Sequence, residues 1–287
     1  MIPRIIHYVW MGNAPLTPTA EQCVASWKEH MSEWQYMQWD EDSLTRAMQE
    51  PNLNPPLKGR TPKQAHNQSQ DTKIWLDFMP TYVKQAYEAR KFAFVSDYVR
   101  LWALEKFGGL YMDVDFEVFR SFDDLMDKYP AFAGYEGSKR KPVMQGVIAS
   151  EPHGAWVKDM LSTYKCREFI KPNGSLDLTP NTSYFTDRLE AQGFIADGIE
   201  KDFYIDSPLI PNPSSLIEGK TFFLHVFPVH YFCPVLTTGE DVRTPETYCE
   251  HKGESSWAKK GWKSKLLVHV SPSFRTKLIK LKRRILG

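Results

Sequence analysis

The sequence predicts an α/β fold in which helices flank a mixed central sheet of short strands. Three apolar runs, at residues 5–10, 110–115 and 132–135, have the length and composition of buried strands, and helical segments alternate with them. The glycines Gly108 and Gly109 end the clearest helix and lead directly into a strand. The chain of 287 residues is 42% hydrophobic and 25% charged, which suits one large globular domain.

The first elements are predicted from apolar runs and turn residues. Residues 5–10 are expected to form a buried strand that ends at the turn-forming residues 11–15. A helix over 21–30 and a second strand over 34–39 come next. Residues 51–70 are polar and rich in Pro, Asn and Gln, a composition that leaves open whether they form an ordered loop or an insertion.

The longest predicted helix covers residues 84–107. Its second half is apolar on nearly every face, which is typical of a buried helix. A short strand over 110–115 follows at once, and two more are predicted over 132–135 and 143–150. An amphipathic helix is predicted over 155–167.

Charge is distributed unevenly along the chain. The net charge is +1, but the segment from Ser255 to the C-terminus holds ten basic residues and no acidic one, so the rest carries −9. A basic end of this kind predicts an anionic partner. Within it, four apolar residues fall on one stripe of a helix: Phe274, Leu278, Leu281 and Ile285.

We therefore divide the chain into a globular domain over 1–271 and a basic amphipathic tail over 272–287. The tail is expected to lie on an anionic membrane surface. The alternative is a helix that packs on the domain and leaves its basic face in solvent. Nucleic-acid binding is not expected, because no recognition motif accompanies the basic residues.

The expected location is the cytoplasm, peripheral to the inner face of the cytoplasmic membrane. The first ten residues lack the layout of a signal peptide, and no apolar run approaches the roughly 18 residues that span a bilayer. The four cysteines are scattered, and we expect free thiols in a reducing compartment.

Two acidic residues, Asp113 and Asp115, stand at the end of the predicted strand over 110–115. Residues two apart on a strand point to the same side, so both carboxylates are expected to face one way. Carboxylates this close repel one another unless a cation or a proton lies between them. Oxygen ligands suit Mn²⁺ or Mg²⁺, which also bind diphosphate oxygens, so the pair predicts a metal site.

A second pair of charged residues, Asp97 and Arg100, lies on the buried helix. The two stand three residues apart and are therefore neighbours on the helix surface. Burying both charges is costly unless each is well hydrogen-bonded. A cleft in which they bind polar groups of a ligand is the favoured interpretation, and a purely structural ion pair is the alternative.

These motifs resemble those of a known enzyme family. Residues 96–115, with Asp97, Arg100, the glycine pair and the two aspartates, resemble the DXD sugar-binding region of the family 32 glycosyltransferases. The group includes yeast-type mannosyltransferases and many bacterial polysaccharide enzymes, and it is similar to the core of the large clostridial glucosylating toxins. Residues 2–12 look like the family's opening strand, and 247–257 resemble its closing His-x-x-x-x-Ser-Trp element.

The resemblance implies a fold and a reaction. The fold is of the GT-A type, a Rossmann-like nucleotide-sugar-binding domain. The reaction is the metal-dependent transfer of a hexose from a UDP- or GDP-sugar to a saccharide or lipid-linked saccharide, with retention of anomeric configuration. The implied setting is the synthesis of bacterial surface polysaccharide.

The resemblance also implies roles for residues that bind the donor. Trp10 would stack on the nucleobase, although a core tryptophan on a first strand is the alternative. Asp97 and Arg100 would hold sugar and ribose hydroxyls, and Gln145 falls beside the transferred sugar, so these three are the candidate catalytic residues.

A further set of roles concerns the metal, Mn²⁺ or Mg²⁺, and the diphosphate. Asp115 would bind the metal directly, Asp113 would contact the metal or the sugar and ribose, and His251 would complete the metal site. Ser256 and Trp257 would reach the diphosphate as their loop closes.

The chain also departs from the family pattern. Residues 179–183 lack the usual Gly-Pro pair, which leaves the acceptor side open, and Lys252 replaces the usual aromatic residue. Two other functions stay possible from the residues: a metal-dependent phosphotransferase or hydrolase that uses the paired aspartates, and a catalytically inactive sugar-binding protein.

Overall fold

A computed structural model describes residues 1–12, 14–49, 74–137, 143, 145–205, 216–217 and 220–253. The strands are β1 (Ile5–Val9), β2 (Gln35–Trp39), β3 (Gly109–Met112), β4 (Phe116–Val118), β5 (Ala131–Gly134), β6 (Val147–Ser150), β7 (Lys201–Ile205), β8 (Leu216–Ile217), β9 (Lys220–Phe227) and β10 (Cys249–His251). The helices are α1 (Pro18–His30), α2 (Glu41–Gln49), α3 (Ile74–Asp77), α4 (Thr81–Glu88), α5 (Phe92–Phe107), α6 (Asp123–Lys128), α7 (Ala155–Thr163), α8 (Asn181–Ala191) and α9 (Val229–Phe232).

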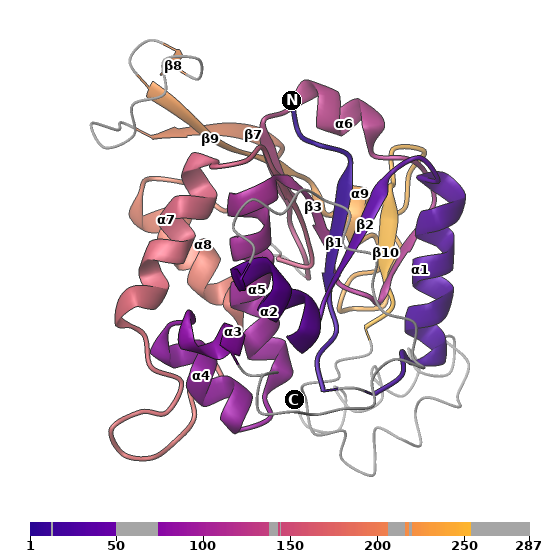
Figure 1. The fold of residues 1–287 in the computed structure, drawn as a ribbon. Helices are drawn as coiled ribbons and strands as arrows, with labels where there is room; N and C mark the ends of the chain where they lie inside the picture. Colours follow the sequence, from indigo (N-terminus) through magenta and orange to yellow (C-terminus); the bar gives the residue numbers. More distant parts are fainter. Residues whose placement is uncertain are drawn as a thin grey trace, which may run out of the picture.

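The described strands form a mixed sheet in the order β2-β1-β3-β6-β5-β9-β7, with β8 paired to β9 (Figure 1). Strands β1, β2 and β3 are parallel, β5 is parallel to β9, and β6 runs antiparallel between β3 and β5. Because β1, β3 and β5 run the same way, they end at one edge of the sheet, and β6 begins there. This arrangement confirms the predicted α/β fold class with a mixed central sheet.

Alternate residues of β1 show how the two faces of the sheet are covered. His7 lies 6.1 Å, between ring centroids, from Phe107 of α5, while Tyr8 meets Trp27 of α1 edge to face at 5.6 Å. Successive side chains of a strand point to opposite faces, so α5 and α1 cover opposite sides of β1. Figure 1 shows α5 and α7 together on one side of the sheet and α1 on the other.

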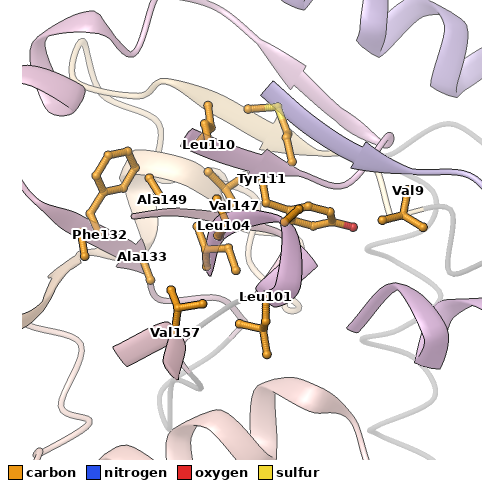
Figure 2. Close-up of a cluster of buried hydrophobic side chains, with 14 of the residues drawn as sticks. Val9, Leu101, Leu104, Leu110, Tyr111, Phe132, Ala133, Val147, Ala149 and Val157 are labelled. Carbon is orange, nitrogen blue, oxygen red and sulfur yellow. The ribbon is translucent and has the colours of Figure 1, made fainter. Parts of the chain in front are cut away.

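The core behind this edge is packed by α5 and α7 (Figure 2). Leu101 and Leu104 of α5 and Val157 of α7 are fully buried, as are Leu110 of β3 and Val147 of β6. Each buried side chain of this size contributes roughly 1.5–3 kcal/mol by leaving water. The packing fixes the ends of β3 and β6 relative to α5, and these are the segments that carry the polar residues of the site.

A glycine pair makes the sharp connection from α5 to β3. Gly108 and Gly109 have φ values of 65° and 112°, in the left-handed region that favours glycine. A Cβ on Gly109 would lie 2.6 Å from the carbonyl oxygen of Ile5, so only glycine fits between β3 and β1. The pair therefore lets the DXD segment follow the buried helix without a loop.

The predicted single helix over 84–107 is wrong, because the structure has two helices, α4 and α5, separated at residues 89–91. Arg90 takes a left-handed φ of 55°, and the amide of Lys91 donates to the carbonyl of Ala86. This hydrogen bond, from one residue to the residue five before it, is that of a Schellman motif, which ends many helices and usually has glycine at the left-handed position. Since arginine occupies that position, the sequence holds no glycine to mark the break.

Two other predicted elements are shorter than expected. The strand predicted over 143–150 begins at Val147, and Val143 forms only an isolated bridge to Tyr135. The helix predicted over 155–167 ends at Thr163 and continues as a 3₁₀ turn to Cys166. Residues 51–70 and the tail over 272–287 lie outside the described residues. Within the described part of the chain, no helix is long and apolar enough to span a bilayer.

His7 joins β1 to β2 and to the glycine turn. Its Nδ1 accepts from the indole N–H of Trp39 at 3.1 Å, and its Nε2 lies 2.8 Å from the carbonyl oxygen of Gly108. An indole only donates and a carbonyl only accepts, so the imidazole is neutral and carries its proton on Nε2. Burial lowers the pKa of His7 to about 4.

We expect the free energy of unfolding to fall as the pH drops from 6.5 to 4. The unfolded histidine binds a proton near its ordinary pKa of 6.5, whereas the folded one stays neutral down to about 4. The free energy of unfolding is therefore about 3 kcal/mol lower at pH 4 than at pH values well above 6.5. Denaturant titrations of the wild type and of His7→Gln across this range measure it. Identical pH dependence in both proteins would contradict the account.

Candidate functional site

A pocket of about 530 Å³ opens at the edge where β1, β3 and β5 end. Trp10 follows β1, Asp113 and Asp115 follow β3, and Gln145 precedes β6. The helix α5 adds Asp97 and Arg100, and the other polar residues of the lining are Arg90, Lys91, Ser96, Glu136, Asn181, Thr182 and His251. The sheet edge therefore brings together every candidate site residue that the structure describes.

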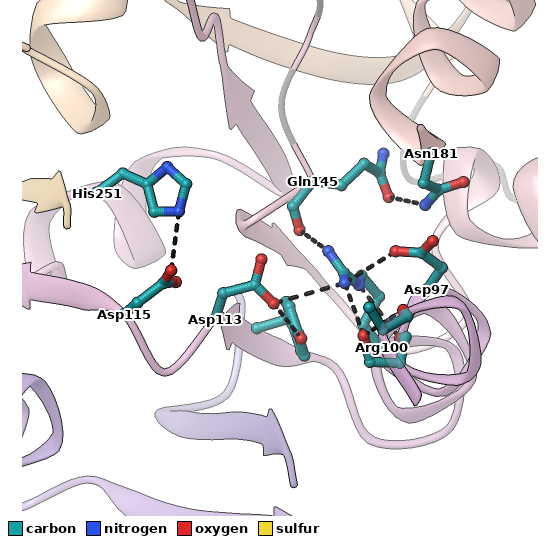
Figure 3. A network of polar contacts seen from close by, with 10 residues as sticks. Asp97, Arg100, Asp113, Asp115, Gln145, Asn181 and His251 are labelled. Carbon is teal, nitrogen blue, oxygen red and sulfur yellow. Dashed lines mark hydrogen bonds and ion pairs between the residues drawn. The ribbon is translucent and has the colours of Figure 1, made fainter. Parts of the chain in front are cut away.

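Arg100 is the centre of the polar network (Figure 3). Its Nη2 lies 2.9 Å from Oδ1 of Asp97 and 3.5 Å from Oδ1 of Asp113, and its Nη1 donates to the carbonyl of Gln145 at 2.7 Å. The guanidinium carbon also sits 4.5 Å above the ring of Tyr111. These contacts join α5, the end of β3 and the start of β6 through one buried side chain.

The contacts around Arg100 shift the pKa values of the charged side chains that line the pocket. Burial raises the pKa of Asp97 to about 6, and the neighbouring Arg100 opposes this effect. Burial alone would lower the pKa of Arg100, but Asp113, Tyr111 and Asp97 outweigh it, so the pKa is raised. Arg100 is therefore a permanent cation between two carboxylates, with its side chain only 6% exposed.

The two aspartates of the DXD motif do not face one way, and that prediction is wrong. Strand β3 ends at Met112, and residues 113–115 lie in the turn that leads into β4, where the alternation of a strand no longer applies. Asp113 accepts from the hydroxyl of Tyr111 at 2.6 Å and faces Arg100, whereas Asp115 faces His251. Figure 3 shows the two carboxylates directed to these different partners.

His251 reaches Asp115 because β10 pairs antiparallel with β4 and places His251 opposite Phe116. The two rings stack with centroids 4.6 Å apart, and Nε2 of His251 lies 3.1 Å from Oδ2 of Asp115. The amide of Lys252 donates to the carbonyl of Asp115 at 2.8 Å. A residue 136 positions away is thus fixed against the DXD turn by strand pairing and ring stacking.

The described residues offer a partial metal site. No three His, Cys, Asp or Glu side chains converge on one point in the described part of the chain. Asp115 and His251 supply one carboxylate and one imidazole, and both line the pocket. This donor set suits Mn²⁺ or Mg²⁺ when diphosphate oxygens and water complete the shell. Metal binding by Asp113, Asp115 and His251 stays a prediction.

Gly146 allows the start of β6 to pass close to the DXD turn. A Cβ there would lie 2.7 Å from the ring of Phe116 and 3.1 Å from Oδ2 of Asp113. The amide of Asp113 donates to the carbonyl of Gly146 at 2.8 Å. The glycine therefore sets the close spacing of Asp113 and Gln145.

Trp10 is half-buried and lines the pocket. Its backbone amide donates to Trp39, and its indole N–H donates to the carbonyl of Ala14 at 2.6 Å. One ring edge is thus held while part of the ring faces the pocket. This placement disfavours the core alternative, and base stacking stays a prediction.

Six polar residues of the pocket are not among the site residues predicted from the sequence: Arg90, Lys91, Ser96, Glu136, Asn181 and Thr182. Asn181 donates to the amide oxygen of Gln145 at 3.2 Å and accepts from the hydroxyl of Tyr164. A signal for Glu136 existed, because it follows a strand as Asp113 does, and parallel strands end at one edge. Ser256 and Trp257, the two predicted diphosphate ligands, lie outside the described residues.

Comparison with known proteins gives the class. Residues 18–132 match the family described as the glycosyltransferase sugar-binding region containing a DXD motif, and this stretch includes Asp97, Arg100 and both aspartates. The match confirms the predicted enzyme class, a glycosyltransferase, for this region. The mixed sheet flanked by helices, with the DXD turn at its edge, is the α/β architecture that the sequence predicted.

Individual relatives are distant. A stretch of 84 residues is 32% identical to glucan organizing enzyme 1 of Cryptococcus neoformans var. grubii, and the match spans 26% of this chain and 23% of that protein. The PaToxG glycosyltransferase structure is 18% identical, covers 67% of this chain and 70% of its own, and has a TM-score of 0.42. The UDP-bound glycosyltransferase domain of the YGT toxin is 13% identical, covers 67% and 68%, and has a TM-score of 0.37.

Proposed function

We propose that the chain is a metal-dependent glycosyltransferase that moves a hexose from a UDP- or GDP-sugar to a saccharide or a lipid-linked saccharide. One observation carries the proposal. The buried Arg100, paired with Asp97 and Asp113, forms the floor of a pocket whose wall holds the Asp115–His251 pair. A fixed cation, carboxylates and a site for a divalent ion are the groups that a sugar diphosphate needs.

The order of the strands at the edge suggests how the donor lies. Trp10, at the end of β1, takes the base, and Asp115, after β3, lies beside the diphosphate. Asp97, Arg100 and Gln145, between β3 and β6, then face the ribose and the transferred sugar. Their mixture of donors and acceptors suits hydroxyl groups, which both donate and accept.

Asp115 and His251 would hold the metal, and Asp113, which faces Arg100, would lie beside the sugar and ribose. When bound, a divalent ion neutralises the negative charge that develops on the leaving diphosphate. The chain's own residues orient the donor. Transfer proceeds with retention, as the resemblance implies: the acceptor oxygen bonds to the anomeric carbon as the bond to phosphate breaks, and the leaving phosphate oxygen takes the acceptor's proton.

A donor screen by nucleotide release tests this function. The full chain is incubated with Mn²⁺ and a panel of UDP- and GDP-sugars, and released UDP or GDP is measured with and without a chelator. We expect slow, metal-dependent release from sugars of one base, because water replaces the acceptor. Absence of both binding and release with every donor would contradict the proposal.

We expect Trp10→Ala to weaken binding of the released nucleotide by about 5- to 150-fold, since stacking of a base on an aromatic ring contributes roughly 1–3 kcal/mol. The melting temperature without ligand should change little, because the residue is only half-buried and lines the pocket. Calorimetric titration and thermal denaturation measure the two effects. Trp156→Ala, which removes a fully buried ring, is the control that should show the reverse pattern. Normal nucleotide binding by an unstable Trp10→Ala protein would favour a core role.

The proposed setting is the synthesis of bacterial surface polysaccharide on the inner face of the cytoplasmic membrane, with the tail over 272–287 in contact with anionic lipid. Each basic residue near such a surface contributes about 1 kcal/mol. We expect the full chain to co-sediment with anionic vesicles at low salt, and a truncation after Ser271 to stay in the supernatant. Equal behaviour of the two proteins would contradict the membrane contact.

A further inference from the structure

The pocket extends beyond the residues assigned to the donor. Along the sheet edge the strands follow in the order β1, β3, β6 and β5. Neighbouring strands lie about 4.8 Å apart, so the ends of β1 and β5 are about 14 Å from each other. Trp10 stands at the β1 end and Glu136 at the β5 end of the same pocket. With the base at Trp10, Glu136 lies on the far side of the transferred sugar.

Glu136 has no role in the donor site. It is only partly exposed, and burial raises the pKa of its carboxyl group, an effect that His251 opposes. Thr182 lines the same pocket, and its hydroxyl lowers the pKa of the Glu136 carboxyl group, against the effect of burial. Among the described residues Glu136 forms no ion pair, so its carboxylate keeps acceptor capacity toward the pocket.

Hydrogen-bond donors line the same pocket as this carboxylate. The helix α8 begins at Asn181, on the pocket wall, and Pro180 before it provides no side-chain cap. The amide nitrogen of Gln145 is buried, and no described residue accepts from it, although Asn181 holds the amide oxygen. A carboxylate would repel an anion, whereas an acceptor among donors suits a hydroxyl group. The chemistry of this end is therefore that of a sugar ring.

We propose that Glu136, Thr182 and the start of α8 bind the acceptor saccharide, and that Glu136 accepts a hydrogen bond from a hydroxyl group beside the attacking one. The inference rests on the proposed glycosyl transfer. This hydrogen bond orients the acceptor so that its attacking hydroxyl faces the anomeric carbon. The new carbon–oxygen bond forms as the bond to the diphosphate breaks, and the hydroxyl proton passes to the leaving phosphate oxygen, so Glu136 is a binding and positioning residue.

The test separates acceptor from donor effects in the full chain. The variants are Glu136→Gln and Thr182→Val. The matched control is Glu190→Gln, which changes an exposed carboxylate on α8, the helix that also holds Thr182. The probes are the active nucleotide sugar, its nucleotide, and the methyl glycosides of glucose, galactose and mannose. We measure nucleotide and nucleotide-sugar affinity, hydrolysis without a glycoside, and the transfer product with one.

We expect Glu136→Gln to lower kcat/KM for the glycoside about 10- to 100-fold, because a hydrogen bond to a charged group is lost. Nucleotide affinity, nucleotide-sugar affinity and hydrolysis should stay within about twofold, and Glu190→Gln should match the wild type.

Three results would overturn the inference. Glu136→Gln could lose nucleotide-sugar affinity as strongly as it loses transfer, or it could transfer as well as the wild type. The wild type could also hydrolyse the nucleotide sugar but transfer to none of the glycosides. Absence of nucleotide binding and hydrolysis in the wild type would instead contradict the proposed function itself.

Discussion

Replacing Arg100 by methionine is expected to abolish donor binding and to destabilise the fold by about 3–5 kcal/mol. The change leaves Asp97, 14% exposed, without the cation that lies 2.9 Å away, and an unpaired buried charge costs this much. It also removes the bond to the carbonyl of Gln145, which holds the start of β6 against α5. Denaturant titration measures the stability, and calorimetry measures nucleotide affinity.

A double variant separates these two effects. Asp97→Asn combined with Arg100→Met removes the buried charge pair together, so much of the lost stability should return, as seen when buried ion pairs are replaced by neutral groups. Donor binding should not return, because the cation of the pocket floor is still missing. A stable double variant that binds nucleotide sugar normally would show that Arg100 is purely structural.

Replacing Asp115 by asparagine is expected to lower the rate of metal-dependent nucleotide release at least about 10²-fold. The amide keeps the shape of the side chain but loses the charge that attracts a divalent ion. The melting temperature should change little, since stacking on Phe116 still holds His251. Release assays over a range of Mn²⁺ concentrations measure the effect.

The matched control is Asp187→Asn, which changes an exposed carboxylate on α8 and should behave as the wild type. Wild-type release by Asp115→Asn at ordinary Mn²⁺ concentrations would remove this residue from the metal site. Recovery only at high Mn²⁺ would support it.

The sequence alone predicts the layout of the site's scaffold well. The apolar faces of the segment around Arg100 predict a buried helix, and the glycines at 108 and 109 predict its end. Both predictions depend on local rules: burial follows from periodicity, and the turn follows from the left-handed φ that glycine tolerates. The ion pair of Asp97 and Arg100 is predictable for the same reason, since their spacing on a helix fixes their proximity.

Features that depend on long-range contacts were harder to predict. The alternation of side chains along a strand predicts that Asp113 and Asp115 lie on one face. However, β3 ends at Met112, one residue before Asp113, and the two carboxylates contact different partners, Arg100 and His251. Nothing local to Arg90 marks the break before α5. Glu136 and Asn181 meet only because β5 and the start of α8 reach the same sheet edge, which is a property of the topology.

The most direct test of the central claim is a crystal structure of the full chain with Mn²⁺ and the nucleotide that the donor screen identifies. We expect an anomalous peak for the metal about 2 Å from a carboxylate oxygen of Asp115. We also expect the base against Trp10 and the diphosphate between Trp10 and Arg100. A nucleotide bound outside this pocket, or a metal held away from Asp115, would contradict the account.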